Sequence, residues 1–379
     1  MPQTPKIETP KIETPKLAPR RRAPLVALVP ALALLIAGGA LLARDGIATL
    51  GALPAPAEAE TPAQAAVQAD AATPAGLALP AALDTLETRI DRAELLRTLS
   101  ILAHDSMEGR QTGTEGGERA RRFLLLAFDE RELAPVAGTR SQEFSFTPRG
   151  RDITLSGLNV MGMVEGRVHP EHYIIVTAHY DHLGVRGDDI FNGADDNASG
   201  TAAILHLAEW FRENPPRHSI IFAALDAEEM GLQGARAFVD HPPVPLERLV
   251  MNVNLDMISR SEVGELYAAG TYHYPFLTPL VEEVARDARI TLLMGHDSPD
   301  LPPGDDWTMA SDHGPFHQRG IPFIYFGNED HPGYHHPSDT FENITPGFYH
   351  GAVETILDFI LVADREGERI LAAREGTGG

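Results

Sequence analysis

Apolar and polar residues alternate in two different patterns over most of this chain. Four apolar runs have the length of β-strands, and three of them are rich in Ile, Val or Phe with little polar alternation, which is typical of strands buried on both faces. These runs cover residues 173–178, 219–225, 249–255 and 321–326. Segments with the spacing of amphipathic helices lie before and between them, at residues 91–104, 114–133, 200–212, 231–239 and 279–288. The succession predicts an α/β fold with an open, mostly parallel, doubly wound sheet, helices on both faces and a single globular domain.

The N-terminal residues precede this pattern and divide into three parts. Residues 1–22 repeat a Thr-Pro-Lys-Ile-Glu unit and end in three arginines; proline at every fifth position excludes a helix, so we expect a disordered basic tail. Residues 23–43 carry no charge and, as a helix, would extend about 31 Å, enough to cross a bilayer. Residues 44–82 are rich in Ala and Pro and predict a linker. The domain is then expected over residues 83–373, followed by a disordered tail at 374–379.

The charges around the uncharged segment predict its orientation. Six basic residues precede it and Arg44 follows it, which favours an N-terminus inside the cell and an exported domain, on the periplasmic or extracellular side. Two interpretations remain open. The segment is either an uncleaved signal anchor in the inner membrane or a signal peptide cleaved near residues 38–40. A buried core helix is a third, weaker interpretation, because nothing nearby in the sequence could pack on it.

The composition of the chain excludes several kinds of partner, metal site and catalytic residue. The net charge of −23 argues against nucleic-acid partners, which select basic surfaces. The chain has no cysteine, which excludes disulfides, thiolate metal sites, iron–sulfur clusters and thiol nucleophiles. All lysines lie within the first 16 residues, so no lysine of the domain can form a Schiff base or bind phosphate. Any metal must therefore be held by His, Asp and Glu.

Such side chains follow each of the four apolar runs. They are His179 and Asp181; Asp226, Glu228 and Glu229; Asp256; and His331, His335 and His336. Ligands of doubly wound sheets bind outside the carboxyl ends of the strands, so these side chains are expected to meet there. Histidine and carboxylate ligands without cysteine suit catalytic zinc. Two zinc ions sharing one bridging carboxylate could activate a water molecule and polarise a carbonyl together.

Asp195 and Asp196 lie between the first run and its helix. They can be read as helix N-caps, as part of a calcium loop, or as a bridging carboxylate. The spacing of an EF-hand loop and its closing Glu are absent, and the neighbouring motifs favour the bridge.

Five motifs together resemble a known family. They are His179-Tyr-Asp181, Gly193-Ala-Asp-Asp-Asn-Ala-Ser-Gly200, Asp226-Ala-Glu-Glu-Met-Gly-Leu232, Asn254-Leu-Asp256 and Tyr334-His-His-Pro-Ser-Asp-Thr340, and the stretch Met107–Thr114 also fits. In this order they resemble the two-zinc, co-catalytic aminopeptidases of the aminopeptidase S and glutamate carboxypeptidase II type, metallopeptidase clan MH. The resemblance covers about residues 90–365 and implies a zinc-exopeptidase fold with two Zn²⁺ per chain.

The resemblance also implies roles for individual residues. The implied metal ligands are His179, Asp196, Glu229, Asp256 and His335, with Asp196 as the bridge. His335 is preferred to His336 because it stands four residues before the Asp of Asp339-Thr340. Glu228 is implied as the general base, Asp181 as the acid that orients His179, and Tyr334 as a stabiliser of the oxyanion. A cis peptide is implied between Asp196 and Asn197.

The function expected from these residues is that of an exported zinc aminopeptidase acting on peptides, with contact to the membrane only through residues 23–43. Two other functions stay open: a single-zinc enzyme similar to glutaminyl cyclase, and a non-catalytic binding domain. Surface or packing roles are expected for His182, His206, His218, His241 and His296. His313 lies in a family-like stretch, and the loop at residues 302–308 is expected to line the pocket.

Overall fold

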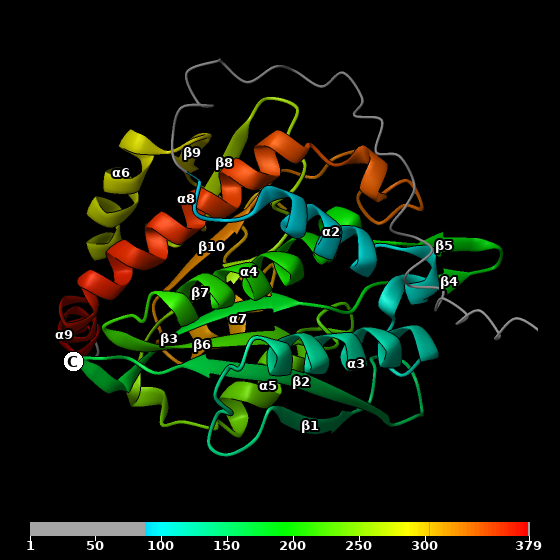
Figure 1. Cartoon of the computed structure of the whole chain (residues 1–379), viewed down its shortest axis with the longest axis horizontal. Helices are drawn as coiled ribbons and strands as arrows, with labels where there is room; N and C mark the ends of the chain where they lie inside the picture. The colour runs from blue at the N-terminus through cyan, green and yellow to red at the C-terminus, as the bar shows by residue number, and fades with distance from the viewer. Residues whose placement is uncertain (1–87, 303, 378–379) are drawn as a thin grey trace, which may run out of the picture. The chain divides into compact units, whose positions relative to one another are not determined.

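A mixed sheet of eight strands forms the centre of the part that the computed structural model describes, residues 88–302 and 304–377 (Figure 1). The strand order is β1-β2-β6-β3-β7-β10-β8-β9. The strands are β1 (Ser141–Phe146), β2 (Leu155–Val164), β3 (His169–His179), β6 (His218–Leu225), β7 (Leu249–Leu255), β8 (Glu265–Ala269), β9 (Thr291–Met294) and β10 (Phe323–Gly327). The four central strands β6, β3, β7 and β10 are parallel, which confirms the predicted sheet.

Antiparallel strand pairs, which were not predicted, occur towards both edges of the sheet. Strands β1 and β2 form a hairpin and β2 pairs antiparallel with β6, while β8 runs antiparallel to β10. Outside the sheet, β4 (Gly184–Arg186) and β5 (Asp189–Phe191) form a separate small hairpin. The fold is therefore mixed at its edges and parallel at its centre.

Helices cover both faces of the sheet (Figure 1). They are α2 (Arg92–Leu102), α3 (Glu115–Glu130), α4 (Gly200–Glu213), α5 (Gln233–Asp240), α6 (Thr278–Asp287), α7 (His313–Gln318), α8 (Pro346–Arg365) and α9 (Gly367–Thr377). Five of them match the predicted helical segments within a few residues. Helices α2, α3, α4 and α8 share one apolar core with the sheet, and α5 and α7 share the other.

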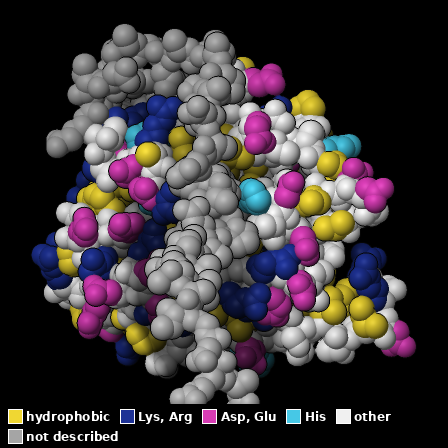
Figure 2. Space-filling view, turned by 45° about the vertical axis from the view of Figure 1, so that its right-hand side comes forward, with side chains coloured by type: hydrophobic (Ala, Val, Ile, Leu, Met, Phe, Trp, Pro, Cys, Tyr) yellow, Lys and Arg dark blue, Asp and Glu magenta, His cyan; other side chains and the backbone are white. Residues whose placement is uncertain are grey.

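Alternate strand residues supply these two cores. Ile174 and Val176 of β3 face the larger core, whereas Ile175 faces the smaller one. The same alternation holds in β6, where Ile220 and Ile221 are both fully buried but belong to different cores. Burial on both faces explains why these strands appear in the sequence as continuous apolar runs. On the face of the molecule shown in Figure 2, hydrophobic side chains instead lie scattered among charged ones.

Several expectations concern residues beyond the described ranges. The basic tail, the uncharged segment 23–43 and the linker 44–82 all lie outside them. In the ranges described, no helix has the length and apolar character needed to cross a membrane. The expected disordered tail is wrong for residues 374–377, because α9 continues to Thr377. The Arg374 guanidinium holds that end by donating hydrogen bonds to the backbone carbonyls of Leu246 and Leu249.

Candidate functional site

The carboxyl ends of the central strands bring the predicted side chains together. His179 ends β3, the Glu228-Glu229 pair follows β6 and Asp256 follows β7. They line a cleft of about 390 Å³, together with Asp196 and with His335, Tyr334 and Trp307 from the loops around β10. Trp307 and Gly304 belong to the loop that was expected to line the pocket, and that expectation is confirmed.

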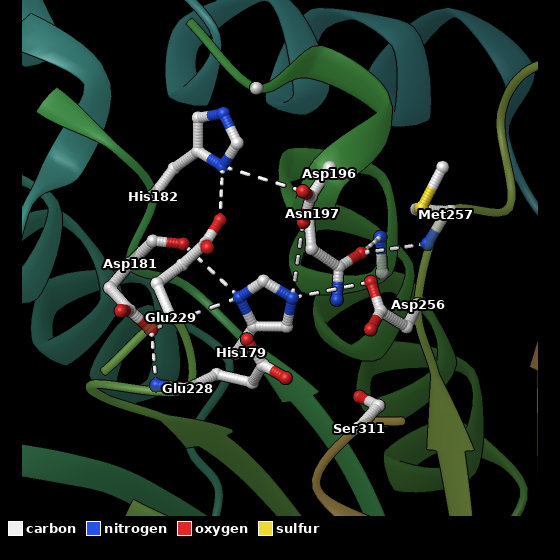
Figure 3. Close-up of polar contacts among 12 residues, drawn as sticks. His179, Asp181, His182, Asp196, Asn197, Glu228, Glu229, Asp256, Met257 and Ser311 are labelled. Atoms are coloured by element: carbon white, nitrogen blue, oxygen red, sulfur yellow. Dashed lines mark hydrogen bonds and ion pairs between the residues drawn. The ribbon is translucent and has the colours of Figure 1, made fainter. Parts of the chain in front are cut away.

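Asp196 lies between two groups of potential metal ligands, His179 with Asp256 and His182 with Glu229 (Figure 3). Its Oδ1 is 3.3 Å from Nε2 of His179, and its Oδ2 is 3.1 Å from Nε2 of His335. On the first side, Asp256 Oδ1 lies 3.2 Å from the same His179 nitrogen. On the second side, Glu229 Oε2 lies 3.4 Å from the same His335 nitrogen. The two oxygens of one carboxylate therefore face two different ligand groups.

The tautomer of His179 follows from its neighbours. Its Nδ1 is 3.1 Å from the backbone carbonyl of Asp181, which can only accept, so Nδ1 carries the hydrogen. The lone pair of Nε2 in the neutral ring then faces the Asp196 and Asp256 carboxylates. Burial opposes a charge on His179, yet these carboxylates raise its pKa well above the ordinary value. A positive charge, either a proton or a metal cation, is therefore favoured between His179 Nε2 and these carboxylates. The histidine nitrogen and the carboxylate oxygens are suited to bind a metal cation.

Asp181 orients His179 by a different route from the one expected. The Oδ1 of Asp181 is 3.7 Å from Nδ1 of His179, beyond hydrogen-bond distance. The backbone carbonyl of Asp181 makes that contact instead. Its carboxylate accepts a hydrogen bond from the backbone N–H of Glu228 at 3.0 Å. Asp181 thus holds both His179 and the chain at Glu228.

His182 also belongs to the site, and its interpretation as an ordinary surface or packing residue is wrong. Its side chain is fully buried, with Nδ1 2.7 Å from Glu229 Oε1 and 3.6 Å from Asp196 Oδ2. Despite this closeness, His182 Nδ1 and Glu229 Oε1 are not aligned as a hydrogen bond, and neither atom has a hydrogen-bond partner among the described residues. Unpartnered polar atoms that converge in this way suit a shared metal ion. The position of His182 three residues after His179 was the available signal.

Two further carboxyl groups lie beside the ligand groups without joining them. Burial raises the pKa of Glu228 well above its ordinary value, and Asp256 and Asp312 add to this effect against the opposing charge of His179. Burial likewise raises the pKa of Asp312 to about 7, and neither of its carboxyl oxygens has a hydrogen-bond partner in the described part of the chain. The sequence analysis missed Asp312, although it stands next to His313 in a stretch that was noted.

The loop that carries Asp196 is held from several sides. The Asp339 carboxylate accepts hydrogen bonds from the backbone N–H groups of Asp195 and Asp196, at 3.0 and 3.1 Å. Asp195 does not face the ligand groups; its Oδ1 accepts from the backbone and hydroxyl of Ser259. The peptide between Asp196 and Asn197 is cis, as the resemblance implied. These contacts fix Asp196 rather than Asp195 at the centre of the site.

Arg110 also stabilises the loop that carries Asp196. Its side chain is fully buried and donates four hydrogen bonds to backbone carbonyls. The acceptors are Tyr180 at 2.8 Å, Leu102 at 2.7 Å, Asn192 at 2.6 Å and Gly193 at 2.9 Å. One guanidinium thus joins the turn after β3 to the loop that leads to Asp196.

The last loop presents one of its three histidines to the ligand groups. His335 lies beside Asp196 and Glu229, whereas His336 is exposed and His331 contacts Asp195 at 3.2 Å. The ring of Tyr334 stacks on that of His335, with centroids 3.9 Å apart. Burial and the nearby carboxylates raise the pKa of Tyr334, so its hydroxyl keeps its proton and can donate.

Comparison with known proteins gives one family. A model described as "Peptidase family M28" matches residues 159–360. Among curated proteins, the chain is 33% identical over 233 residues to aminopeptidase YwaD of Bacillus subtilis, covering 56% of this chain and 47% of that protein. It is 31% identical over 201 residues to probable glutamate carboxypeptidase VP8 of Zea mays, covering 48% and 26%. The chain thus spans about half or less of the length of these relatives.

Solved structures share the fold. BSAP, a zinc aminopeptidase from Bacillus subtilis, superimposes with a TM-score of 0.59 at 19% identity, over 73% of this chain and 96% of that one. A glutaminyl cyclase from Porphyromonas gingivalis gives a TM-score of 0.59 at 18% identity, over 72% and 99%. At these identities the likeness concerns the fold.

Proposed function

This chain belongs to peptidase family M28, and from that membership and the geometry of its cleft we propose that it is a zinc-dependent exopeptidase that removes N-terminal residues from peptides. The observation that carries the proposal is Asp196, whose two oxygens face two separate groups of histidine and carboxylate ligands. Such an arrangement is suited to two metal ions that share one bridge.

Nitrogen and oxygen ligands without thiolates favour zinc in a catalytic setting. His179 and Asp256 would hold one ion, Glu229 and His335 the other, and Asp196 both. His182, which forms a group of potential ligands with Asp196 and Glu229, is a further candidate ligand of the second ion. Bound zinc would polarise the scissile carbonyl and make water a better nucleophile at neutral pH.

Glu228 is proposed as the general base. It lines the cleft but belongs to neither ligand group, so its carboxylate is free to move protons. It can accept the proton of the attacking water and deliver it to the leaving amine. Burial strengthens it as a base by raising its pKa. Tyr334 is proposed to donate a hydrogen bond to the oxygen on which negative charge develops.

The charge of the cleft favours an N-terminal over a C-terminal substrate. Apart from the proposed metal ligands, the described side chains that line it include the carboxylates of Glu228 and Asp330 and no Arg or Lys. A carboxypeptidase needs a cation for the terminal carboxylate of its substrate. An acidic cleft instead attracts the terminal ammonium group. Leu232, Met257 and Trp307 add apolar surface for a substrate side chain.

The roles proposed for the neighbouring residues Glu228 and Glu229 can be tested separately by substitution. Glu228→Gln keeps size and polarity but removes the base, so we expect full metal content with turnover lower by about 10²–10⁴. Glu229→Gln should instead lower metal content. Both variants and the wild type would be assayed for bound zinc and for hydrolysis of a panel of aminoacyl reporter substrates. Loss of zinc in Glu228→Gln with retention in Glu229→Gln would reverse the roles.

The same assays address the alternatives. A glutaminyl cyclase, a chemistry found on this fold, would bind one zinc and cyclise an N-terminal Gln substrate without releasing an amino acid. A binding domain would turn over neither substrate. Chelator-sensitive release of amino acids, together with the loss of two zinc ions per chain when Asp196 is replaced, would support the aminopeptidase.

A further inference from the structure

A second group of potential metal ligands lies at the opposite end of β3 from the cleft. It consists of His169 and His172 in the first part of β3, His218 at the start of β6, and Glu368 in α9. His169 and His179 are ten residues apart on one strand, which separates them by about 33 Å. This group, called the α9 histidine cluster below, is thus independent of the cleft and of the function proposed for it.

The distances within the cluster have the size of a zinc coordination shell. Glu368 Oε1 is 3.0 Å from His172 Nδ1, 3.3 Å from His218 Nε2 and 3.6 Å from His169 Nδ1. All four ligand atoms lie within 4.8 Å of one another. A tetrahedral zinc with bonds of about 2.0–2.1 Å would place its ligands about 3.3 Å apart. The three distances from Glu368 to the histidine nitrogens are close to this spacing.

The partners of His218 make a cation favourable at this place. The Nδ1 of His218 lies 3.0 Å from Oδ1 of Asp364, a carboxylate that also accepts the backbone N–H groups of Arg217 and His218 at 2.8 Å. With its hydrogen on Nδ1, the neutral ring points the Nε2 lone pair at the Glu368 carboxylate, which is repulsive unless a cation lies between them. A carboxylate behind a histidine is the usual support for a metal-binding imidazole.

The surroundings hold the His218 ring in this orientation. Its side chain is 1% exposed. A Cβ at Gly367 would lie 2.5 Å from the ring, so glycine at the start of α9 leaves room for it. Burial opposes a charge on His218, yet hydrogen bonds to Asp364 and Glu368 raise its pKa. The electrostatic demand for a positive charge is therefore present in a side chain that is already fixed.

We propose that the α9 histidine cluster binds one divalent transition-metal ion, best suited to zinc, and that this ion fastens α9 to the sheet. Three imidazoles and one carboxylate are borderline ligands that favour zinc over magnesium or calcium. Glu368 lies beyond the residues that match the family model, so the ligand set joins the family core to a helix outside the match. His169 and His172 are half-buried and Glu368 is exposed, which leaves a path for the ion.

The experiment compares zinc content and local protection in the whole chain. The variants are the double substitution His169→Ala/His172→Ala and, separately, Glu368→Gln, which preserves shape at an exposed position. His241→Ala, an exposed histidine outside the cluster, is the matched control. After dialysis against zinc, we expect wild type and control to hold one more zinc per chain than the double variant. Circular dichroism verifies folding, and release of amino acids from reporter substrates should stay unchanged.

Amide hydrogen exchange locates the ion. Zinc should slow exchange in α9 of the wild type and the control but leave exchange in α9 of the double variant and of Glu368→Gln unaffected. Equal zinc content in wild type and double variant would overturn the proposal and leave a cluster in which protonated histidines pair with Glu368. A loss of zinc in His241→Ala as large as in the double variant would overturn it as well. Loss of the catalytic metals alone would alter turnover and leave α9 unchanged.

Discussion

Arg110→Met is expected to destabilise this protein more than most single substitutions. Arg110 is fully buried and donates four hydrogen bonds to backbone carbonyls on three segments. Methionine replaces the aliphatic part of the arginine side chain but has no donor, so these carbonyl acceptors would be left unpaired in the interior. Hydrogen bonds from a charged donor contribute about 1.5–3 kcal/mol each.

The burial of the positive charge of Arg110 offsets part of the stability that these hydrogen bonds contribute. Burial lowers the pKa of Arg110 to about 10 against the attraction of Asp196 and Asp339, and this difference from the ordinary value is worth about 3 kcal/mol. Four hydrogen bonds amount to about 6–12 kcal/mol, and water can reach some of the freed carbonyls. We therefore expect the free energy of unfolding to fall by about 3–6 kcal/mol.

Urea unfolding followed by circular dichroism, in the presence of chelator, measures this change without a contribution from metal. Arg97→Met is the control, because Arg97 is exposed and its ion pair, with Glu94, lies on the surface of its own helix, so its loss should cost less than about 0.5 kcal/mol. Zinc affinity should also drop in Arg110→Met, since Gly193 leads into the loop of Asp196. A loss of stability below about 1 kcal/mol, or equal to that of Arg97→Met, would refute the role assigned to Arg110.

Two further predictions concern stability and the metal loop. Burial lowers the pKa of His206 to about 4, so the folded state keeps this ring neutral while the unfolded state takes up a proton below about pH 6.5. The contribution of the neutral ring to the free energy of unfolding is therefore present above pH 6.5 and is lost as the pH falls towards 4. The expected loss is about 2 kcal/mol between pH 7 and pH 5. The urea midpoint should therefore fall less between pH 7 and pH 5 in His206→Gln than in the wild type. An equal fall in both proteins would contradict this. Gly193→Ala should weaken zinc binding and stability, because a Cβ would lie 2.1 Å from the Asp196 carbonyl oxygen and 2.5 Å from His182. Gly187→Ala, also with positive φ but in open space, isolates this crowding, and equal effects of both substitutions would contradict it.

The parallel centre of the sheet and the place of the site follow from local sequence. The central parts of strands β3, β6, β7 and β10 are buried on both faces, so they are mostly apolar and the runs are visible without context. Acids and histidines follow directly after those runs, and parallel strands bring their ends to one edge. The ligand groups around Asp196 were therefore expected before any distance was known.

The edge strands of the sheet and the contacts that support the site depend on tertiary structure. Strand β1 is only partly buried, and the polar residues in it obscure its pattern. His182 and Asp312 acquire their meaning from burial beside Asp196, His179 and Asp256, which no local spacing encodes. The α9 histidine cluster joins residues 169 and 368, almost 200 positions apart. Local sequence determines which segments are apolar enough to form the core, whereas only the packing of that core decides which distant polar groups must satisfy one another.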